Sequence, residues 1–276
     1  MNTLFISDLD GTLLRPNVEL SKRTIRVLNK LIAQGMKFSV ATARTIASVK
    51  PILKDVTIEL PLILMNGACI YDSTENRYIK IEHFSEKSKN LLLSVIKEYQ
   101  LKGFAYSIKE DVLSTYYEDI STKPLRDFYK ERVNKYKKPF IQVDNFADLK
   151  EEPLIYFSLM DRKESLDEVY QIFQDIPDVN CTYYKDNYTP DIWYLEIFHN
   201  QASKYHAVQY LRDHYYFDSI VCFGDNRNDL PLFQGSDIKI AVANAFPELK
   251  IKADIIIGSN QEDGVATWLE KNFRNY

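Results

Sequence analysis

The sequence predicts an α/β protein in which a parallel-sheet domain is built from both ends of the chain and a smaller α+β domain is inserted between them. Three observations support this prediction. Apolar strand-like segments alternate with helix-like segments over residues 1–80, the pattern changes near residue 81, and the alternation returns near residue 200. We therefore expect one discontinuous domain of residues 1–80 and 200–276 and an inserted domain of residues 81–199.

The N-terminal segment contains three short apolar runs that predict strands, at Thr3–Asp8, Lys37–Ala41 and Leu62–Met65. Ser21 can cap a helix between the first two runs, and Gly35 fits its C-terminal end. The apolar face of that helix is expected at Ile25, Leu28, Leu31 and Ile32. Strands separated by helices indicate βαβ units and therefore a parallel sheet.

The inserted segment mixes helices and strands less regularly. Apolar residues at helical spacing predict helices within 91–99 and 166–173. Strand-like runs cover Phe104–Ile108, Leu154–Met160 and Trp193–Phe198. Tyrosines and lysines gather in this segment, and they can either bind a polar substrate or pack the core of the domain; we favour packing for most of the tyrosines.

The C-terminal segment restores the first pattern. A helix is expected over 206–211, and strands are expected at Ser219–Phe223, Ile238–Val242 and Ile255–Ile257. The simplest arrangement places these strands in one parallel sheet with those of the N-terminal segment.

The composition is that of an ordinary globular protein, with 45% hydrophobic and 27% charged residues among 276. A net charge of −4 and the lack of a dense basic run give no reason to expect a nucleic-acid partner. Cys69, Cys181 and Cys222 lie far apart and are expected to be buried, free thiols in a reducing compartment. We expect no signal peptide, no membrane span and a cytoplasmic location.

Two acidic clusters follow predicted strands at opposite ends of the chain. They are Asp8-Leu9-Asp10-Gly11-Thr12 and Gly224-Asp225-Asn226-Arg227-Asn228-Asp229. Neighbouring carboxylates disfavour joint ionisation unless a cation holds them. If the fold brings both clusters together, they form a hard-cation site beside a nucleophilic carboxylate, which is the signature of Mg²⁺-dependent phosphoryl transfer. For the first cluster alone, an ordinary Asp-Gly turn explains the pattern about equally well.

Two further polar side chains fall at predicted strand ends or helix starts. Thr42 ends the second strand, and Lys204 begins a C-terminal helix. Ligands of open parallel sheets bind at the carboxyl ends of the strands, where these side chains and the two acidic clusters would meet. Taken singly, Thr42 is a good helix cap, Lys204 an ordinary solvated lysine, and Asp229 an acid favoured in a first helical turn.

Together these motifs resemble the haloacid dehalogenase superfamily, and most closely its Cof-type sugar-phosphate phosphatases. The matching pieces are Asp8-Leu9-Asp10-Gly11-Thr12-Leu13-Leu14, Thr42-Ala43-Arg44, Asn66-Gly67-Ala68, Lys204, Gly224–Asp229, Ala241-Val242-Ala243-Asn244-Ala245, Glu248-Leu249-Lys250, Ala253-Asp254 and Glu262-Asp263-Gly264-Val265-Ala266. The similarity covers both ends of the chain. Two positions depart from the pattern: Ala43 and Tyr205 stand where relatives often have glycine.

The resemblance implies a Rossmann-like parallel-sheet core with an inserted α+β cap domain that acts as a lid. It also implies that Asp8 is the nucleophile and that Asp10 is the general acid and base. The implied Mg²⁺ ligands are Asp8, Asp10 through its backbone carbonyl, Asp225 and Asp229. The implied phosphate-binding groups are the side chains of Thr42, Lys204 and Asn228 and the backbone amides of Leu9 and Ala43.

The expected function is therefore a Mg²⁺-dependent phosphatase that hydrolyses small, sugar phosphate-like metabolites through an aspartyl phosphate. A phosphotransferase or phosphomutase of the same superfamily remains an alternative, as does a non-catalytic protein that binds phosphorylated metabolites. A nucleotide-binding dehydrogenase is disfavoured because no Gly-x-Gly-x-x-Gly motif follows a strand. The physiological substrate and the oligomeric state are left open by the sequence.

Overall fold

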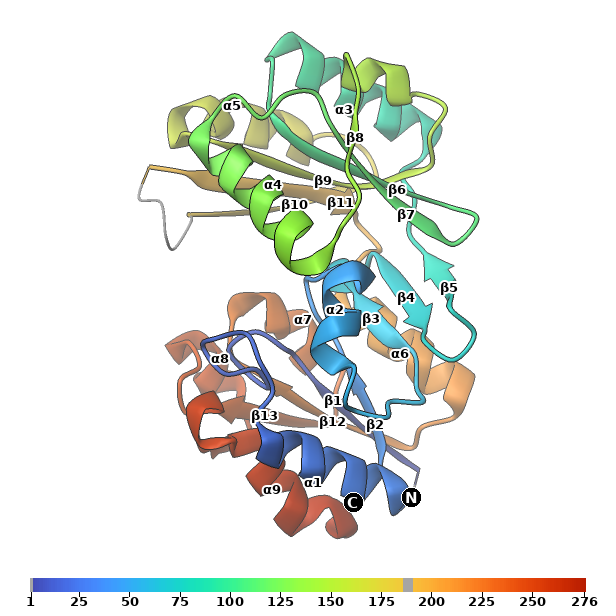
Figure 1. Ribbon diagram of the computed structural model, residues 1–276, viewed down its shortest axis with the longest axis vertical. Helices are drawn as coiled ribbons and strands as arrows, with labels where there is room; N and C mark the ends of the chain where they lie inside the picture. Colours follow the sequence, from blue (N-terminus) through green and yellow to red (C-terminus); the bar gives the residue numbers. More distant parts are fainter. Residues whose placement is uncertain (1, 186–190) are drawn as a thin grey trace. The chain divides into compact units, whose positions relative to one another are not determined.

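The computed structural model describes residues 2–185 and 191–276, and the chain divides into two compact units. The discontinuous unit consists of the residues up to Lys80 together with Ala202–Tyr276, and the inserted unit is Ile81–Gln201. In Figure 1 the blue and red ends of the chain therefore share one unit, while green and yellow segments form the other.

A five-stranded parallel sheet forms the centre of the discontinuous unit, in the order β14-β13-β12-β1-β2. Its strands are β1 (Thr3–Ser7), β2 (Lys37–Val40), β12 (Ser219–Gly224), β13 (Ile238–Val242) and β14 (Ile255–Ile257). Every residue of β1 and of β12 is buried, as expected for central strands covered on both faces. This confirms the predicted α/β class.

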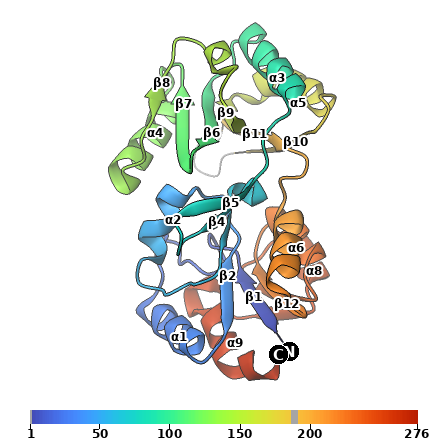
Figure 2. The same ribbon diagram turned by 90° about the vertical axis from the view of Figure 1, so that its right-hand side faces the viewer.

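Helices cover both faces of this sheet (Figure 2). They are α1 (Lys22–Ala33), α2 (Ile46–Leu53), α6 (Lys204–Tyr215), α7 (Leu230–Gln234), α8 (Pro247–Lys252) and α9 (Gly264–Asn272). The predicted cap of α1 is confirmed, because the Ser21 side chain accepts a hydrogen bond from the Thr24 amide. Leu28 and Leu31 are buried as predicted, whereas Ile25 and Ile32 are only half-buried.

The third predicted strand does not extend the parallel sheet. Strand β3 (Leu62–Leu64) pairs antiparallel with β4 (Cys69–Asp72), and β5 (Arg77–Ile81) completes a separate three-stranded sheet. Only an isolated parallel bridge joins Ile63 to Ala41, next to β2. The reason is local: the short turn Met65–Gly67 has positive φ at all three residues, which reverses the chain at once instead of crossing over.

The inserted unit contains a six-stranded sheet in the order β10-β11-β9-β6-β7-β8. All its pairs are antiparallel except β7 with β8. Its strands are β6 (Gly103–Lys109), β7 (Val112–Tyr117), β8 (Ile141–Gln142), β9 (Leu154–Asp161), β10 (Val179–Lys185) and β11 (Trp193–His199). Its helices are α3 (Glu86–Glu98), α4 (Lys123–Tyr136) and α5 (Lys163–Gln174).

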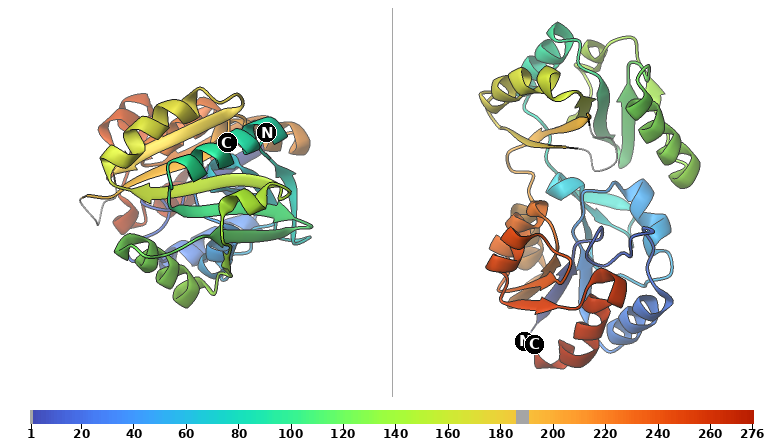
Figure 3. Two further views of the ribbon diagram at one scale, coloured as in Figure 1. Left: turned by 90° about the horizontal axis from the view of Figure 1, so that it is seen from above. Right: turned by 90° about the vertical axis from the view of Figure 1, so that its left-hand side faces the viewer.

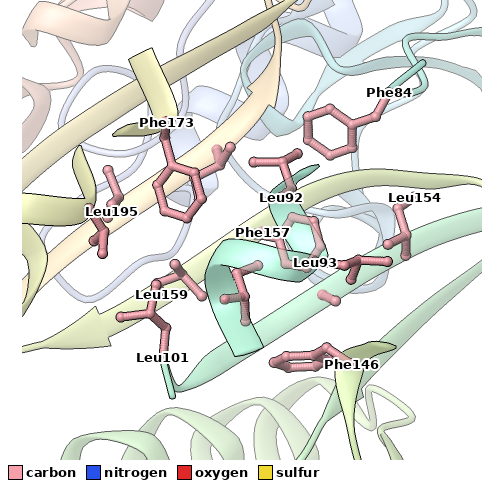
Figure 4. Close-up of a cluster of buried hydrophobic side chains, with 14 of the residues drawn as sticks. Phe84, Leu92, Leu93, Leu101, Phe146, Leu154, Phe157, Leu159, Phe173 and Leu195 are labelled. Atoms are coloured by element: carbon pink, nitrogen blue, oxygen red, sulfur yellow. The ribbon is translucent and has the colours of Figure 1, made fainter. Parts of the chain in front are cut away.

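The two faces of this sheet are covered differently (Figure 3). Helices α3 and α5 cover one face and bury the main apolar core of the unit, which includes Leu92, Phe157, Phe173 and Leu195 (Figure 4). Alternate residues of β6 and β9 point to the opposite face. There Phe104 stacks on Phe128 of α4, with ring centroids 4.7 Å apart.

The three cysteines are free, and Cys69 and Cys222 are buried as predicted, whereas Cys181 is only half-buried. Within the described residues, no helix combines the length and the apolar character that crossing a membrane requires.

Candidate active site

Three carboxylates from distant parts of the sequence meet at the carboxyl edge of the parallel sheet. Asp8 follows β1 and Asp225 follows β12, and these strands are neighbours with Ser7 in register with Phe223. The Asp8 backbone amide donates to the Phe223 carbonyl at 3.0 Å. The segments that follow β1 and β12 therefore leave the sheet side by side. Asp8, Asp225 and Asp229 each offer a carboxylate oxygen within 4.8 Å of the others, and all three residues are buried. The acidic clusters therefore do come together.

Lys204 lies between two of these carboxylates. Its Nζ is 2.6 Å from Asp8 Oδ1 and 2.7 Å from Asp229 Oδ1, and the residue is only 1% exposed. Burial by itself lowers the pKa of Lys204, but the charges of Asp229 and Asp8 outweigh that effect and raise it. Lys204 is therefore not a solvated lysine. It begins α6, where Ser203 caps the helix by accepting from the His206 amide.

Asp229 organises the loop that carries Asp225. Its Oδ1 accepts from Lys204, and its Oδ2 accepts from the backbone amides of Asp225 and Asn226 at 2.9 and 3.1 Å. Gly224 allows this close approach, since a Cβ there would lie 2.8 Å from the Asp229 Cβ. Asp229 is thus both the acid of a short helical turn and a direct partner of Lys204.

Asp225 connects the two acidic loops. Its Oδ1 accepts from Thr12 Oγ1 at 2.9 Å, and its Oδ2 would lie only 2.3 Å from a Cβ on Gly11. Gly11 also has φ +80°, a conformation that favours glycine. Burial, followed by the charge of Asp229, raises the pKa of Asp225 to about 7.

The donor set fits a divalent cation that prefers oxygen ligands. Three buried carboxylates share one ammonium, which leaves negative charge in excess. Burial raises the pKa of Asp8 well above its ordinary value, and the Asp229 and Asp225 charges add to that rise against Lys204. A small hard cation would relieve this repulsion, and carboxylate oxygens are the ligands that Mg²⁺ prefers.

Asp10 lies outside this carboxylate cluster. Its side chain is about half exposed, and its two oxygens accept from Arg44 Nε and Nη2 at 2.6 and 2.7 Å. This is the bidentate geometry by which arginine orients a carboxylate. Arg44 stands in the Thr42-Ala43-Arg44 motif, yet the sequence assigned it no role; its position two residues after Thr42 was the available signal.

Thr42 lies beside Asp8, because the Ala41 amide donates to the Ser7 carbonyl where β2 runs next to β1. Thr42 is fully buried, and its Oγ1 accepts from the Arg44 amide at 3.2 Å. It does not cap α2, whose N-cap is Thr45. Ala43 has no positive φ, which explains why alanine replaces glycine there without strain.

Asn66 joins Thr42 to the second acidic loop. The Asn66 backbone amide donates to the Thr42 carbonyl, and its side-chain Oδ1 accepts from Asn228 Nδ2 at 3.3 Å. The turn at Gly67 lies against the start of α6, since a Cβ on Gly67 would be 2.3 Å from the Ser203 carbonyl oxygen. Asn228 is thereby connected through Asn66 to Thr42.

Two asparagines hold the loop that follows Asp8, and the sequence assigned no role to either. Asn244 Nδ2 donates to the Gly11 carbonyl at 2.7 Å, and Asn260 Nδ2 donates to the Leu14 carbonyl at 2.7 Å. The Asn260 amide in turn donates to Asn244 Oδ1. Leu9 lies in the same loop, where its carbonyl accepts from several following amides.

Comparison with known proteins places the chain in a family. The model for haloacid dehalogenase-like hydrolases matches residues 5–269. A 5-amino-6-(5-phospho-D-ribitylamino)uracil phosphatase of Bacillus subtilis, YwtE, is 26% identical over 96% of both chains. The pyridoxal phosphate phosphatase YbhA of Escherichia coli is 21% identical over 95% of both chains.

A solved structure shares the fold. The crystal structure of TM0651 from Thermotoga maritima is 27% identical, with a TM-score of 0.78 over 98% of this chain and 97% of that one. The fold class and the family predicted from the motifs are thereby confirmed. Because the family model spans nearly the whole sequence, this chain belongs to the haloacid dehalogenase-like hydrolases.

Proposed function

We propose that this protein is a Mg²⁺-dependent phosphatase that hydrolyses small phosphorylated metabolites through an aspartyl phosphate on Asp8. The observation that carries the proposal is the buried Asp8 carboxylate, 2.6 Å from Lys204 Nζ and grouped with Asp225 and Asp229. A nucleophilic carboxylate beside an ammonium and a hard-cation site matches the needs of phosphoryl transfer. The phosphatase activities of its relatives support the same assignment.

The metal would be held by the carboxylates of Asp8 and Asp225 and by the backbone carbonyl of Asp10. Asp229 would hold the Asp225 loop and Lys204 in place beside the metal, because its oxygens already accept from Lys204 and from the backbone amides of Asp225 and Asn226. When bound, Mg²⁺ supplies the positive charge that offsets repulsion between the carboxylates and a phosphate dianion.

In the first step, an Asp8 oxygen attacks phosphorus, and the bond between phosphorus and the ester oxygen breaks. Asp10 gives its proton to the departing alkoxide. In the second step, Asp10 takes a proton from water as that water attacks the same phosphorus. The bond between phosphorus and Asp8 breaks, and inorganic phosphate leaves. Arg44 holds the ionised Asp10 through two hydrogen bonds, the form that takes a proton from water in the second step; for the first step Asp10 must carry a proton, so at least one of these hydrogen bonds has to open.

The phosphoryl oxygens would be held by Lys204, by the Thr42 hydroxyl, by the Asn228 amide group and by the backbone amides of Leu9 and Ala43. Two of these donors, Thr42 and Lys204, are buried and are therefore held in place before substrate arrives. Such preorganised donors supply much of the electrostatic stabilisation in phosphoryl transfer. We assign the chemistry to the discontinuous unit and the selection of the leaving group, as a lid, to the inserted unit.

The test is Asp8→Asn, which removes the nucleophile but keeps the shape of the side chain. Asp213→Asn is the matched control, since Asp213 is an exposed residue of α6. The first variant should lose turnover of 4-nitrophenyl phosphate and of a panel of phosphorylated metabolites, while its thermal unfolding stays cooperative; the control should retain wild-type rates. A fully active Asp8→Asn variant would exclude the nucleophile assignment.

Two further measurements address the intermediate and the metal. Rapid quenching followed by borohydride reduction should convert phosphorylated Asp8 to homoserine, which mass spectrometry of the N-terminal peptide detects. Excess chelator should abolish turnover, and added Mg²⁺ should restore it. Release of free inorganic phosphate, rather than transfer to a second sugar hydroxyl, separates a hydrolase from a phosphotransferase or mutase.

A further inference from the structure

The turn of residues 243–246, directly after β13, contacts both acidic loops of the candidate active site. Asn244 Nδ2 donates to the Gly11 carbonyl at 2.7 Å, in the loop that follows β1. The Phe246 backbone amide donates to the Asp225 carbonyl at 2.8 Å, in the loop that follows β12. A single turn therefore holds the main chain of both loops that the proposed function assigns to the metal.

The hydrogen bond from Asn244 fixes the peptide group between Gly11 and Thr12. Its carbonyl accepts from Asn244, and its amide, that of Thr12, donates to the Leu9 carbonyl at 3.3 Å. Thr12 Oγ1 then donates to Asp225 Oδ1 at 2.9 Å. Because Thr12 carries the hydroxyl that orients this carboxylate, a shift of the peptide group would shift Asp225 as well.

Asn244 is itself held in one orientation. Its Oδ1 accepts from the Asn260 backbone amide at 3.0 Å, which directs Nδ2 toward the Gly11 carbonyl. Asn260 Nδ2 donates in turn to the Leu14 carbonyl at 2.7 Å, farther along the same loop. Asn244 is an exposed residue, so we expect that its side chain can be shortened without loss of the fold.

The separation of the two loops decides which cation they fit. Mg²⁺ requires nearly ideal octahedral geometry with oxygen ligands at about 2.0–2.1 Å, whereas Ca²⁺ accepts about 2.3–2.6 Å and variable geometry. Selection between these ions depends on the size and the flexibility of the site. Loosening one loop should therefore weaken the binding of Mg²⁺ more than that of Ca²⁺.

We propose that Asn244 is a positioning residue that keeps the two acidic loops at a separation favouring Mg²⁺ over larger divalent cations such as Ca²⁺. The inference rests on the proposed function in one respect, because it takes these loops as the metal-binding loops. Asn244 acts through the peptide group between Gly11 and Thr12, and it would contact neither the metal nor the substrate.

The experiment measures cation binding without substrate. Mn²⁺ is titrated into the wild type, Asn244→Ala and Asn29→Ala, the EPR signal of free Mn²⁺ gives its Kd, and Mg²⁺ or Ca²⁺ is then added as a competitor. Asn29→Ala is the matched control, since Asn29 Nδ2 donates to the Asp55 carbonyl at 2.8 Å and its Oδ1 accepts from the Thr57 amide at 2.9 Å. Asn29 thus makes the same pair of contacts, but to a segment outside the acidic loops.

In Asn244→Ala the Kd of Mg²⁺ should rise by about 2- to 10-fold, the range expected for the loss of one hydrogen bond. The Kd of Ca²⁺ should rise less, so the preference for Mg²⁺ should fall, whereas Asn29→Ala should keep the wild-type preference. A residue that merely stabilises the fold would not change this preference. Thr12→Val should also lower it, and the double variant should lose less than the product of the two single effects, because Asn244 acts through Thr12.

An unchanged preference in Asn244→Ala would overturn the proposal, whether both ions bind more weakly or neither does. Independent effects of the Asn244 and Thr12 substitutions would overturn the route through Thr12, and a wild type that binds none of the three ions would overturn the inference as a whole. If Asn244→Ala does not fold, Asn244→Ser replaces it, since the serine hydroxyl is one bond closer to the main chain than Nδ2.

Turnover of 4-nitrophenyl phosphate, measured on the same proteins, separates this inference from the proposed function. A wild type that prefers Mg²⁺ through Asn244 but hydrolyses no ester would exclude the phosphatase and leave the role of Asn244 intact. An active wild type whose preference survives Asn244→Ala would exclude the positioning role and leave the phosphatase intact.

Discussion

Replacing Lys204 with methionine should destabilise the discontinuous unit more than any ordinary lysine substitution. Methionine keeps most of the apolar stem, so the change mainly removes the ammonium group. That group donates at 2.6 and 2.7 Å to Asp8 and Asp229. Charged hydrogen bonds contribute about 1.5–3 kcal/mol each, and removing one partner of a buried ion pair costs about 3–5 kcal/mol. We therefore expect a loss of about 3–5 kcal/mol in the free energy of unfolding.

The assay is urea denaturation without divalent cations, analysed for the transition of the discontinuous unit. Lys239→Met is the matched control, because Lys239 lies 4.0 Å from Asp254 and both side chains are partly exposed. Such a surface pair contributes up to about 1 kcal/mol. Added Mg²⁺ should stabilise Lys204→Met more than the wild type, since the site has lost a positive charge.

A Lys204→Met variant as stable as Lys239→Met would refute this reasoning. It would mean that Asp8 and Asp229 are readily neutralised by protonation and that the buried ammonium is not needed to hold them together. Equal stabilisation of variant and wild type by Mg²⁺ would contradict the inference that the cation and Lys204 share the same excess of negative charge.

Two further outcomes are expected. Gly11→Ala should raise the Mg²⁺ concentration needed for activity, because the new methyl group would lie 2.3 Å from Asp225 Oδ2. Gly35→Ala, which has similarly positive φ and open space around it, should show comparable strain but unchanged activity; equal activity of the two variants would contradict the clash. For Lys138, which is buried in the inserted unit, the folded pKa of about 7 lies below the ordinary value of 10.5, so the unfolded state binds more protons between these values. Stability of the inserted unit should therefore rise with pH from 7 toward 10.5, and this rise should disappear in Lys138→Met, as pH-dependent denaturation can measure.

Much of the site could be predicted because local sequence carries it. Short apolar runs followed by Asp8 and by Asp225 mark strand ends, and a parallel sheet places the carboxyl ends of its strands on one edge. The cap at Ser21 and the helix-starting position of Lys204 are likewise local features. The order of motifs along the chain was therefore sufficient to indicate that Asp8 and the Asp225–Asp229 loop would meet, although the Asp10 side chain lies outside that cluster.

The sequence could not show contacts that depend on packing. Nothing local distinguishes Lys204, which is buried against two carboxylates, from the exposed Lys137. The bidentate pair of Arg44 with Asp10 also joins residues brought together only when β2 pairs with β1.

By itself, then, the sequence determined the fold class, since periodicity and turn chemistry act over a few neighbouring residues. Its motifs, through their resemblance to a known family, indicated the family and the acidic residues that gather at the sheet edge. The tertiary structure alone decided that β3 leaves the parallel sheet, that Asp229 holds the Asp225 loop, and that Lys138 is buried. Burial and charge pairing are properties of the packed chain, because they depend on which distant segments fill the space around a side chain.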